Sequence, residues 1–216
     1  MHLMDAKPLW AALVATLMLT AIGTAAAEPF DKGYQAYRYA DWSDHRPPHN
    51  DADEFKSALK AAVQGHSDAQ FLVGELYSAG KGIPRNETEA TKWYRKAAKQ
   101  GHPQAQRYLG NRYYHASGVA KNYREALKWW RAAAEQGEAG AQYILGAQYA
   151  LGTLVPKNYV EAYKWISLAA SRFRPDGREE RLAVGLRDGL ASERMTSAQV
   201  SKGQRLAREW KRKPRE

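Results

Sequence analysis

Hydrophobic and polar positions repeat with a period of 36 residues through the middle of the chain. Eleven positions hold the same residue in three consecutive windows, which start at Ala69, Ala105 and Ala141. They are Ala at position 1, Gln at 2, Gly at 6, Tyr at 9, Asn at 18, Glu at 21, Ala at 22, Lys at 24, Trp at 25, and Ala at 29 and 30. A motif that recurs without gaps at this spacing indicates a stack of repeated structural units.

Each window predicts two helices with a glycine-containing loop between them. Positions 1 to about 11 carry apolar residues at 4, 5 and 9, which form one face of a first helix. Asn at 18 and Glu at 21 predict the start of a second helix as a capping box: the Asn side chain accepts a backbone N–H, and the Glu side chain reaches back to the Asn N–H. Apolar residues at 22, 25, 26, 29 and 30 form its buried stripe. Gln-Gly at 32 and 33 ends it.

The residues shared by the three windows also predict how the helices pack. Gly at 6 and Ala at 22, 29 and 30 are small, so the two helices of a pair are expected to approach closely. Trp at 25 is then expected to fill the gap between neighbouring pairs. Because one pair cannot bury both of its faces, several pairs must stack to form a core.

The flanking segments extend this stack. Ala61, Ala62, Gln64 and Gly65 match the end of the repeat, so residues 28–68 are predicted to be a degenerate first repeat with helices near 30–40 and 51–64. Full repeats then occupy residues 69–104, 105–140 and 141–176. Residues 177–216 predict two capping helices, at 178–191 and 196–212, and a basic tail. The second of these helices starts at a Thr196–Gln199 capping box.

The N-terminus predicts export from the cytoplasm. Fourteen uncharged residues from Leu9 to Ile22 have the length of a secretory apolar region, and Ala25 to Ala27 supply small residues for cleavage after Ala27. We therefore expect residues 1–27 to be a signal peptide and the mature protein to be periplasmic or secreted, with an uncleaved anchor as the alternative. Since no later stretch reaches 18 apolar residues, no transmembrane segment is expected after cleavage.

The repeat motif itself, A-Q-x-x-L-G-x-x-Y followed by E-A-x-K-W-x-x-x-A-A-x-Q-G, resembles the Sel-one-like repeat family. The resemblance covers residues 69–172 strongly and 30–68 weakly. It implies an all-α fold, a right-handed superhelical α/α solenoid of helix-turn-helix repeats related to the tetratricopeptide repeat, with capping helices at the C-terminus. It also implies a protein-protein interaction adaptor or scaffold rather than an enzyme, so no cofactor is expected.

The same resemblance suggests where a protein or peptide would bind. In tetratricopeptide-like stacks the first helix of each pair lines a concave groove, and residues that vary between copies at positions 3, 7, 10 and 11 are expected to point into it. The candidates are Phe71, Glu75, Ser78, Ala79, Arg107, Asn111, Tyr114, His115, Tyr143, Ala147, Ala150 and Leu151. The middle repeat is the most polar of the three, and its Arg and Tyr are residue types enriched in binding hot spots. The alternative is that these are simply solvated groove residues.

Charge and composition narrow the partners. The net charge of +10 divides into −3 for residues 28–68 and +13 for residues 69–216. This uneven distribution of charge along the chain argues against nucleic acid as the partner. It leaves an anionic envelope glycan such as peptidoglycan, bound by the basic face, as the alternative to a protein partner. The chain has no cysteine, which excludes disulfides, thiolate metal sites and a cysteine nucleophile. We expect a monomer.

Two other patterns suggest chemistry only weakly. Gly74 with Gly80-Lys81-Gly82 resembles a phosphate-binding loop, but the spacing is wrong by one and no Ser or Thr follows the lysine. The segment from Asp41 to Asp53 contains His45, His49 and several aspartates. Two prolines between the histidines prevent the helical spacing of a metal site, so we interpret the segment as a solvated acidic loop and expect no metal.

Overall fold

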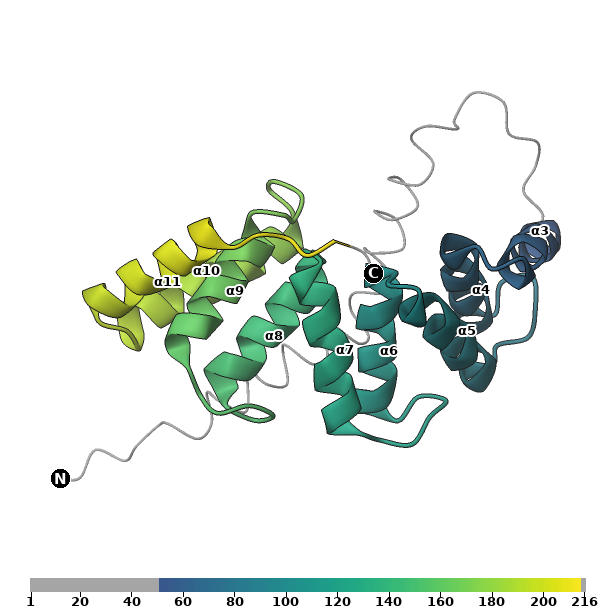
Figure 1. Ribbon diagram of the computed structural model, residues 1–216, viewed down its shortest axis with the longest axis horizontal. Coiled ribbons are helices and arrows are strands. Elements are labelled where there is room, and N and C mark those ends of the chain that lie inside the picture. Colours follow the sequence, from purple (N-terminus) through teal and green to yellow (C-terminus); the bar gives the residue numbers. More distant parts are fainter. Residues whose placement is uncertain (1–50, 215–216) are drawn as a thin grey trace. The chain divides into compact units, whose positions relative to one another are not determined.

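The protein is described by a computed structural model that covers residues 51–214, in which all regular secondary structure is helical (Figure 1). The helices are α3 (Asp51–Val63), α4 (Ser67–Ala79), α5 (Glu87–Lys99), α6 (Pro103–His115), α7 (Tyr123–Glu135), α8 (Ala139–Leu151), α9 (Tyr159–Ala170), α10 (Arg178–Glu193) and α11 (Ser197–Glu209). Each helix from α3 to α10 packs against its neighbours in the chain, and α9 also contacts α11. This arrangement is an α/α repeat solenoid, as predicted.

The two helices of each repeat approach closely at the glycine of position 6. A Cβ atom added at Gly110 would lie 3.1 Å from the carbonyl oxygen of Ala126 and 2.5 Å from Cδ1 of Trp130. Gly74 and Gly146 have equivalent surroundings in their own repeats. Glycine is therefore needed both for the contact with the Ala at position 22 and to leave room for the large side chain at position 26.

Tryptophans at position 25 join neighbouring repeats, as predicted, in the first and third repeats, whereas Trp129 of the middle repeat is only half-buried. Trp93 of α5 is buried together with Phe55, Ala58 and Ala62 of α3, and with two side chains of α4. Trp165 of α9 packs in the same way against α7 and α8. Burying a large aromatic side chain contributes on the order of 1.5–3 kcal/mol, so this residue is a main source of cohesion between units.

The start of each second helix confirms half of the predicted capping box. The Asn122 side chain accepts the backbone N–H of Glu125 at 3.1 Å, and Asn86 and Asn158 cap α5 and α9 in the same way. The other half is wrong. The Asn122 N–H donates instead to the Tyr113 carbonyl at 2.9 Å, and the Glu125 carboxylate accepts the indole N–H of Trp129 at 3.1 Å. The spacing of Glu and Trp that the three repeats share is explained by this bond in α7 and α9. In α5, Glu89 accepts a hydrogen bond from Lys92.

A ladder of buried glutamines follows the repeat. The Gln106 side chain donates to the Ala98 carbonyl at 3.3 Å and accepts from Gln136 at 2.8 Å. Gln70 makes the equivalent bonds one repeat earlier. In the third repeat Arg172 stands where the donating glutamine would be, and the buried Oε1 of Gln142 has no partner within the described part of the chain. The ladder therefore ends where the sequence motif ends.

The predicted C-terminal helices are present, and α11 begins with the predicted Thr196–Gln199 capping box. Both helices pack on α9, where Gly203 of α11 lies against the ring of Tyr163. The segment after α11, drawn as a yellow coil in Figure 1, then returns over α9 to the end of α7. The Lys213 N–H donates to the Glu135 carbonyl at 2.9 Å, so part of the basic tail is bound to the fold.

Several predictions concern residues before Asp51 and lie outside the described residues. These are the signal peptide, the first helix of the degenerate repeat, and the histidines of the His45 loop. The second helix of the degenerate repeat, predicted at 51–64, is α3. Within residues 51–214, no helix combines the length and apolar character needed to cross a bilayer.

Candidate partner-binding face

Burial divides nine of the twelve candidates for the predicted groove into two groups. Phe71, Arg107, Tyr143 and Ala147 have exposed fractions of 2%, 8%, 9% and 5%. Their expected orientation into an open groove is therefore corrected: their side chains pack inside the solenoid. Glu75, Ser78, Asn111 and Tyr114 are half-buried, and His115 is exposed.

Phe71 is the centre of an aromatic cluster that joins the first two repeats. Its ring is stacked on His102 with 4.8 Å between centroids, and it meets Tyr108 of α6 at 5.4 Å and Tyr94 of α5 at 5.7 Å. His102 is itself buried and caps α6, since its Nδ1 accepts the N–H of Ala105. The position that sequence variation suggested for a partner is filled by the neighbouring repeat.

Arg107 forms a buried ion pair. Its Nε lies 3.0 Å from Oε1 of Glu138, which caps α8, and its guanidinium lies over the ring of Tyr108 at 4.5 Å. Gly140 leaves room for the arginine side chain. Burial acts to lower the pKa of Arg107, but the Glu138 carboxylate outweighs burial, and the pKa lies above its usual value. The guanidinium is permanently charged and holds two repeats together.

Tyr143 occupies the same repeat position as Phe71 and Arg107, in the third repeat. Its ring meets Phe173 at 6.4 Å, and burial raises its pKa to about 12. Repeat position 3 is thus buried in all three repeats, and its side chain makes different contacts in each of them. Ala147, one helical turn later, is buried too, so the third repeat offers little of the predicted face.

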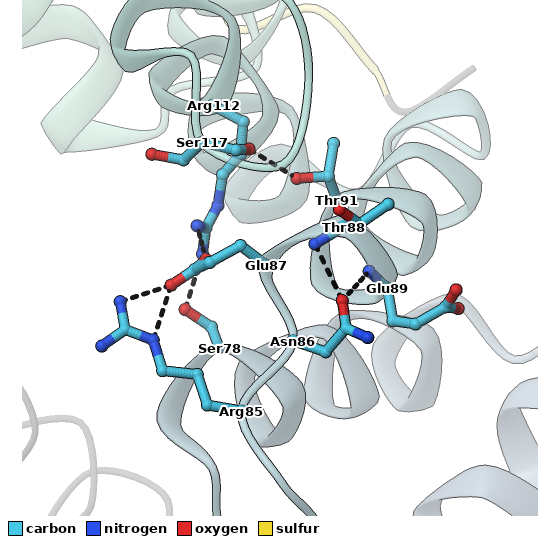
Figure 2. A network of polar contacts seen from close by, with 9 residues as sticks. All are labelled: Ser78, Arg85, Asn86, Glu87, Thr88, Glu89, Thr91, Arg112 and Ser117. Atoms are coloured by element: carbon cyan, nitrogen blue, oxygen red, sulfur yellow. Dashed lines mark hydrogen bonds and ion pairs between the residues drawn. The ribbon is translucent and has the colours of Figure 1, made fainter.

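Ser78 belongs to a polar network that links α4, α5 and α6, shown in Figure 2. Arg112 of α6 donates to the Ser78 hydroxyl at 2.6 Å and pairs with the Glu87 carboxylate. Arg85 donates to the same carboxylate at 2.8 Å, and Thr91 donates to the Ser117 carbonyl at 2.9 Å. This network fixes the loop end of the first repeat to the second repeat and satisfies the charge of Glu87.

Glu75 is the acidic member of the candidate set. It lies close enough to Tyr94 and Tyr108 to raise the pKa of both phenols, although burial is the larger cause at each of them. The side chain is half-buried on α4. It therefore adds negative potential beside the aromatic cluster while remaining partly open to solvent.

The middle repeat presents the most accessible of the candidates. Asn111 accepts the indole N–H of Trp130 at 2.9 Å, which orients both side chains. Tyr114 lies between Trp130 at 5.3 Å and Tyr123 at 5.2 Å, and it meets His115 at 5.0 Å. Burial, and then the positive charges of Lys121 and Arg112, lower the pKa of His115. This end of α6 is a partly exposed aromatic surface with positive potential.

The groove prediction overlooked residues that follow the loops. Tyr123 is 44% exposed and adjoins Tyr114, yet it belongs to a second helix and was outside the positions considered. The sequence did contain a pattern that could have identified these residues, because repeat position 17 is basic in all three copies and position 19 varies between them. Those residues are Arg85, Lys121 and Lys157, and Glu87, Tyr123 and Tyr159. Among residues 51–214, no three His, Asp or Glu side chains are grouped so as to hold a metal ion.

The helix pairs, the repeated glycine and tryptophan contacts and the terminal caps define an α/α repeat scaffold. More specifically, the Sel1 repeat model matches residues 67–102, 103–138 and 139–172, and the chain belongs to the Sel1-like repeat family. Proteins built from these repeats are generally protein-interaction scaffolds rather than enzymes. No curated protein matched the sequence.

Solved structures agree with this assignment. A Sel1 repeat protein from Oxalobacter formigenes is 30% identical with a TM-score of 0.59, over 73% of this chain and 63% of its own. A protective antigen of uropathogenic Escherichia coli strains with an SLR fold is 26% identical with a TM-score of 0.53, over 72% and 40%. The chain thus spans less than two thirds of either protein. Cysteine rich protein B of Helicobacter pylori, 21% identical with a TM-score of 0.50 over 62% and 96%, shares the fold.

Proposed function

We propose that this chain is a non-catalytic adaptor of the bacterial cell envelope that binds a protein or peptide on the exposed part of its first-helix face. The observation that carries the proposal is the surface formed by Tyr114 and His115 at the end of α6 together with Tyr123 at the start of α7, on either side of the loop of the middle repeat. Its aromatic rings are held by packing and by the Asn111–Trp130 hydrogen bond. Rigid, partly exposed aromatic side chains are typical anchors of protein interfaces.

The proposed location rests on the sequence of residues 1–27, which has the features of a signal peptide. An exported scaffold without cysteine must be stabilised by its core alone. The tryptophan contacts between repeats and the close helix pairs supply such a core. We propose a monomer, with the partner recognised by side chains that differ between repeats.

An anionic glycan on the basic face is the competing function. The outer faces of α5 and α7 expose Lys96, Lys99 and Arg131. However, the lysine at position 24 of each repeat lies near the glutamate at position 21: Lys92 and Lys164 at 2.6 Å, and Lys128 at 3.8 Å. Local pairing of this kind lowers the net positive charge available to a polymer, so a protein partner is the stronger proposal.

Photo-crosslinking in an envelope extract tests the proposal. The mature chain would carry a crosslinking amino acid in place of His115, and a second version would carry it in place of Arg131 on the outer face. We expect a discrete protein adduct from position 115 and none from position 131. Adducts from position 131 alone, or retention on isolated peptidoglycan that falls steeply between 50 and 500 mM salt, would favour the glycan function instead.

A further inference from the structure

The edge of the solenoid where first helices end and second helices begin carries a repeated pair of residues, one cationic and one aromatic. In the middle repeat Lys121 Nζ lies 5.7 Å from the centroid of the Tyr123 ring, and in the third repeat Lys157 Nζ lies 6.0 Å from that of Tyr159. We call these four residues the lysine–tyrosine edge. Both lysines are exposed, and Tyr123 is among the most exposed large apolar side chains of the described residues.

The carboxylates nearest in sequence to this edge are already engaged. Glu125 accepts the Trp129 indole at 3.1 Å and lies 3.8 Å from Lys128. Glu161 accepts the Trp165 indole and pairs with Lys164. Within residues 51–214, no carboxylate lies within ion-pair distance of Lys121 or Lys157. The two ammonium groups therefore keep their charge available to a partner.

In the first repeat, a carboxylate of the chain itself binds the cation at the equivalent position. There Arg85 and Glu87 replace the lysine and the tyrosine, and the cation donates to the carboxylate at 2.8 Å. Arg112 from the next repeat adds a second cation to that carboxylate. The first repeat thus supplies its own acidic group, whereas the second and third repeats present the cation with a tyrosine ring and no acid.

Local electrostatics add to the attraction for an anion. The N-termini of α7 and α9, where the helix dipoles are positive, lie at the same edge as the two lysines. Burial, and then the positive charges of Lys121 and Arg112, lower the pKa of His115, so both cations act on this part of the surface. The edge is continuous with the proposed binding face, because Tyr114 contacts Tyr123.

We infer that the lysine–tyrosine edge binds an extended acidic peptide whose two carboxylates pair with Lys121 and Lys157 while apolar residues between them lie on the tyrosine rings. Packed helices lie about 8–10 Å apart, and α7 and α9 both pack on α8, so equivalent positions at the starts of α7 and α9 are separated by up to about 16–20 Å. An extended chain rises about 3.3 Å per residue, which places the two carboxylates about five residues apart. The inference rests on the proposed function, because it names the chemical class of the partner on that face.

Synthetic peptides test the spacing directly. Three fluorescein-labelled octapeptides would be titrated with the mature chain by fluorescence anisotropy: one with two aspartates about five residues apart and leucine and proline residues between them, one with the aspartates adjacent, and one with asparagines replacing both. We expect the first peptide to bind at least fivefold more tightly than either of the others. We also expect its affinity to fall as NaCl rises from 50 to 500 mM. Equal affinities for the aspartate and asparagine peptides would overturn the inference.

Variants assign the binding to the edge. Lys121→Ala and Lys157→Ala are each expected to weaken the first peptide about three- to tenfold, and the double variant by roughly the product. Lys99→Ala, an exposed lysine on the outer face of α5, is the matched control and should change affinity less than twofold. These exposed side chains make no buried contact, so the variants should keep their melting temperatures. An unchanged affinity in the double variant would show that the peptide binds elsewhere.

The same double variant separates this inference from the proposed function. If the adduct formed from position 115 in the envelope extract persists in the Lys121→Ala/Lys157→Ala protein, the adaptor function stands and the acidic-peptide inference fails. If the wild-type chain forms no adduct but binds the spaced aspartate peptide, the edge is a peptide site and the envelope-adaptor proposal fails.

Discussion

At the scale of single residues, Ala116 holds a backbone conformation that glycine holds elsewhere in the repeat. It follows α6 with φ 60° and ψ 34°, whereas Gly80 and Gly152 occupy the same position after α4 and α8 with φ of 70° and 72°. The left-handed conformation costs a residue with a Cβ about 1–2 kcal/mol. The helix end is nevertheless retained, because the next residues are tied down by the bond from Thr91 to the Ser117 carbonyl.

Replacing Ala116 by glycine is expected to stabilise the protein by about 0.5–1 kcal/mol, since relief of the left-handed strain exceeds the entropy that glycine adds to the unfolded chain. Urea unfolding monitored by helical circular dichroism measures the change. Ala120→Gly, in the same loop but without a positive φ, is the control and should be neutral or destabilising. Stabilisation by both changes would mean that the loop is simply tolerant of glycine.

At the scale of helices, two hydrogen-bond systems repeat with the sequence. Asparagines cap the second helices, and buried glutamines connect each first helix to the end of the preceding helix. The two systems fix opposite ends of the helix pair. Because an unpaired buried amide is costly, the glutamine ladder is expected to contribute to specificity of the stacking as well as to stability.

Gln106→Leu tests the ladder. The change keeps the side-chain volume nearly constant but leaves the buried Gln136 amide and the Ala98 carbonyl without partners, so we expect a loss of about 2–3 kcal/mol. The free energy of unfolding in urea gives the value. Gln104→Leu, two residues earlier on the same helix and only half-buried, should cost less than about 0.5 kcal/mol. Similar losses in the two variants would show that the ladder has no special role.

At the scale of the whole molecule, the segment after α11 covers the apolar cluster formed by α7, α8 and α9. The ring centroids of Trp210 and Trp165 lie 6.4 Å apart. The guanidinium of Arg172 lies over the Trp210 ring, 4.6 Å from its centroid. Lys213 then bonds Glu135 through both its backbone and its side chain. The tail therefore acts as a strap across α9 and α7, and part of its positive charge has a structural use.

Trp210→Ala is expected to destabilise the protein by about 2 kcal/mol, less than a fully buried tryptophan would, because the side chain is only half-buried. Thermal unfolding measured by circular dichroism would show a lower melting temperature. Lys211→Ala, an exposed neighbour, is the control and should leave the melting temperature unchanged. An unaltered melting temperature in the tryptophan variant would exclude the strap.

The period of the sequence predicted the helices, their pairing and the tryptophan contacts because these depend on residues within one repeat or the next. Residues such as Gly110 and Ala126 are identical in all three copies, so their contacts recur and need be deduced only once. The role of Glu125 was predicted wrongly for a related reason. The Asn122 N–H that it was expected to bond is taken by the Tyr113 carbonyl, which the preceding helix brings into place.

The sequence by itself thus determined the repeat, the solenoid class and the positions that differ between copies. Only the tertiary structure decided which of those differing positions remain open to a partner. Phe71 is buried because Tyr108 of the following repeat closes over it, and Arg107 because Glu138, the N-cap residue of α8, pairs with it, while Tyr123 at the start of α7 contacts Tyr114 and remains 44% exposed. Exposure of a side chain depends on neighbours more than 30 residues away, and the pattern within one helix does not contain that information.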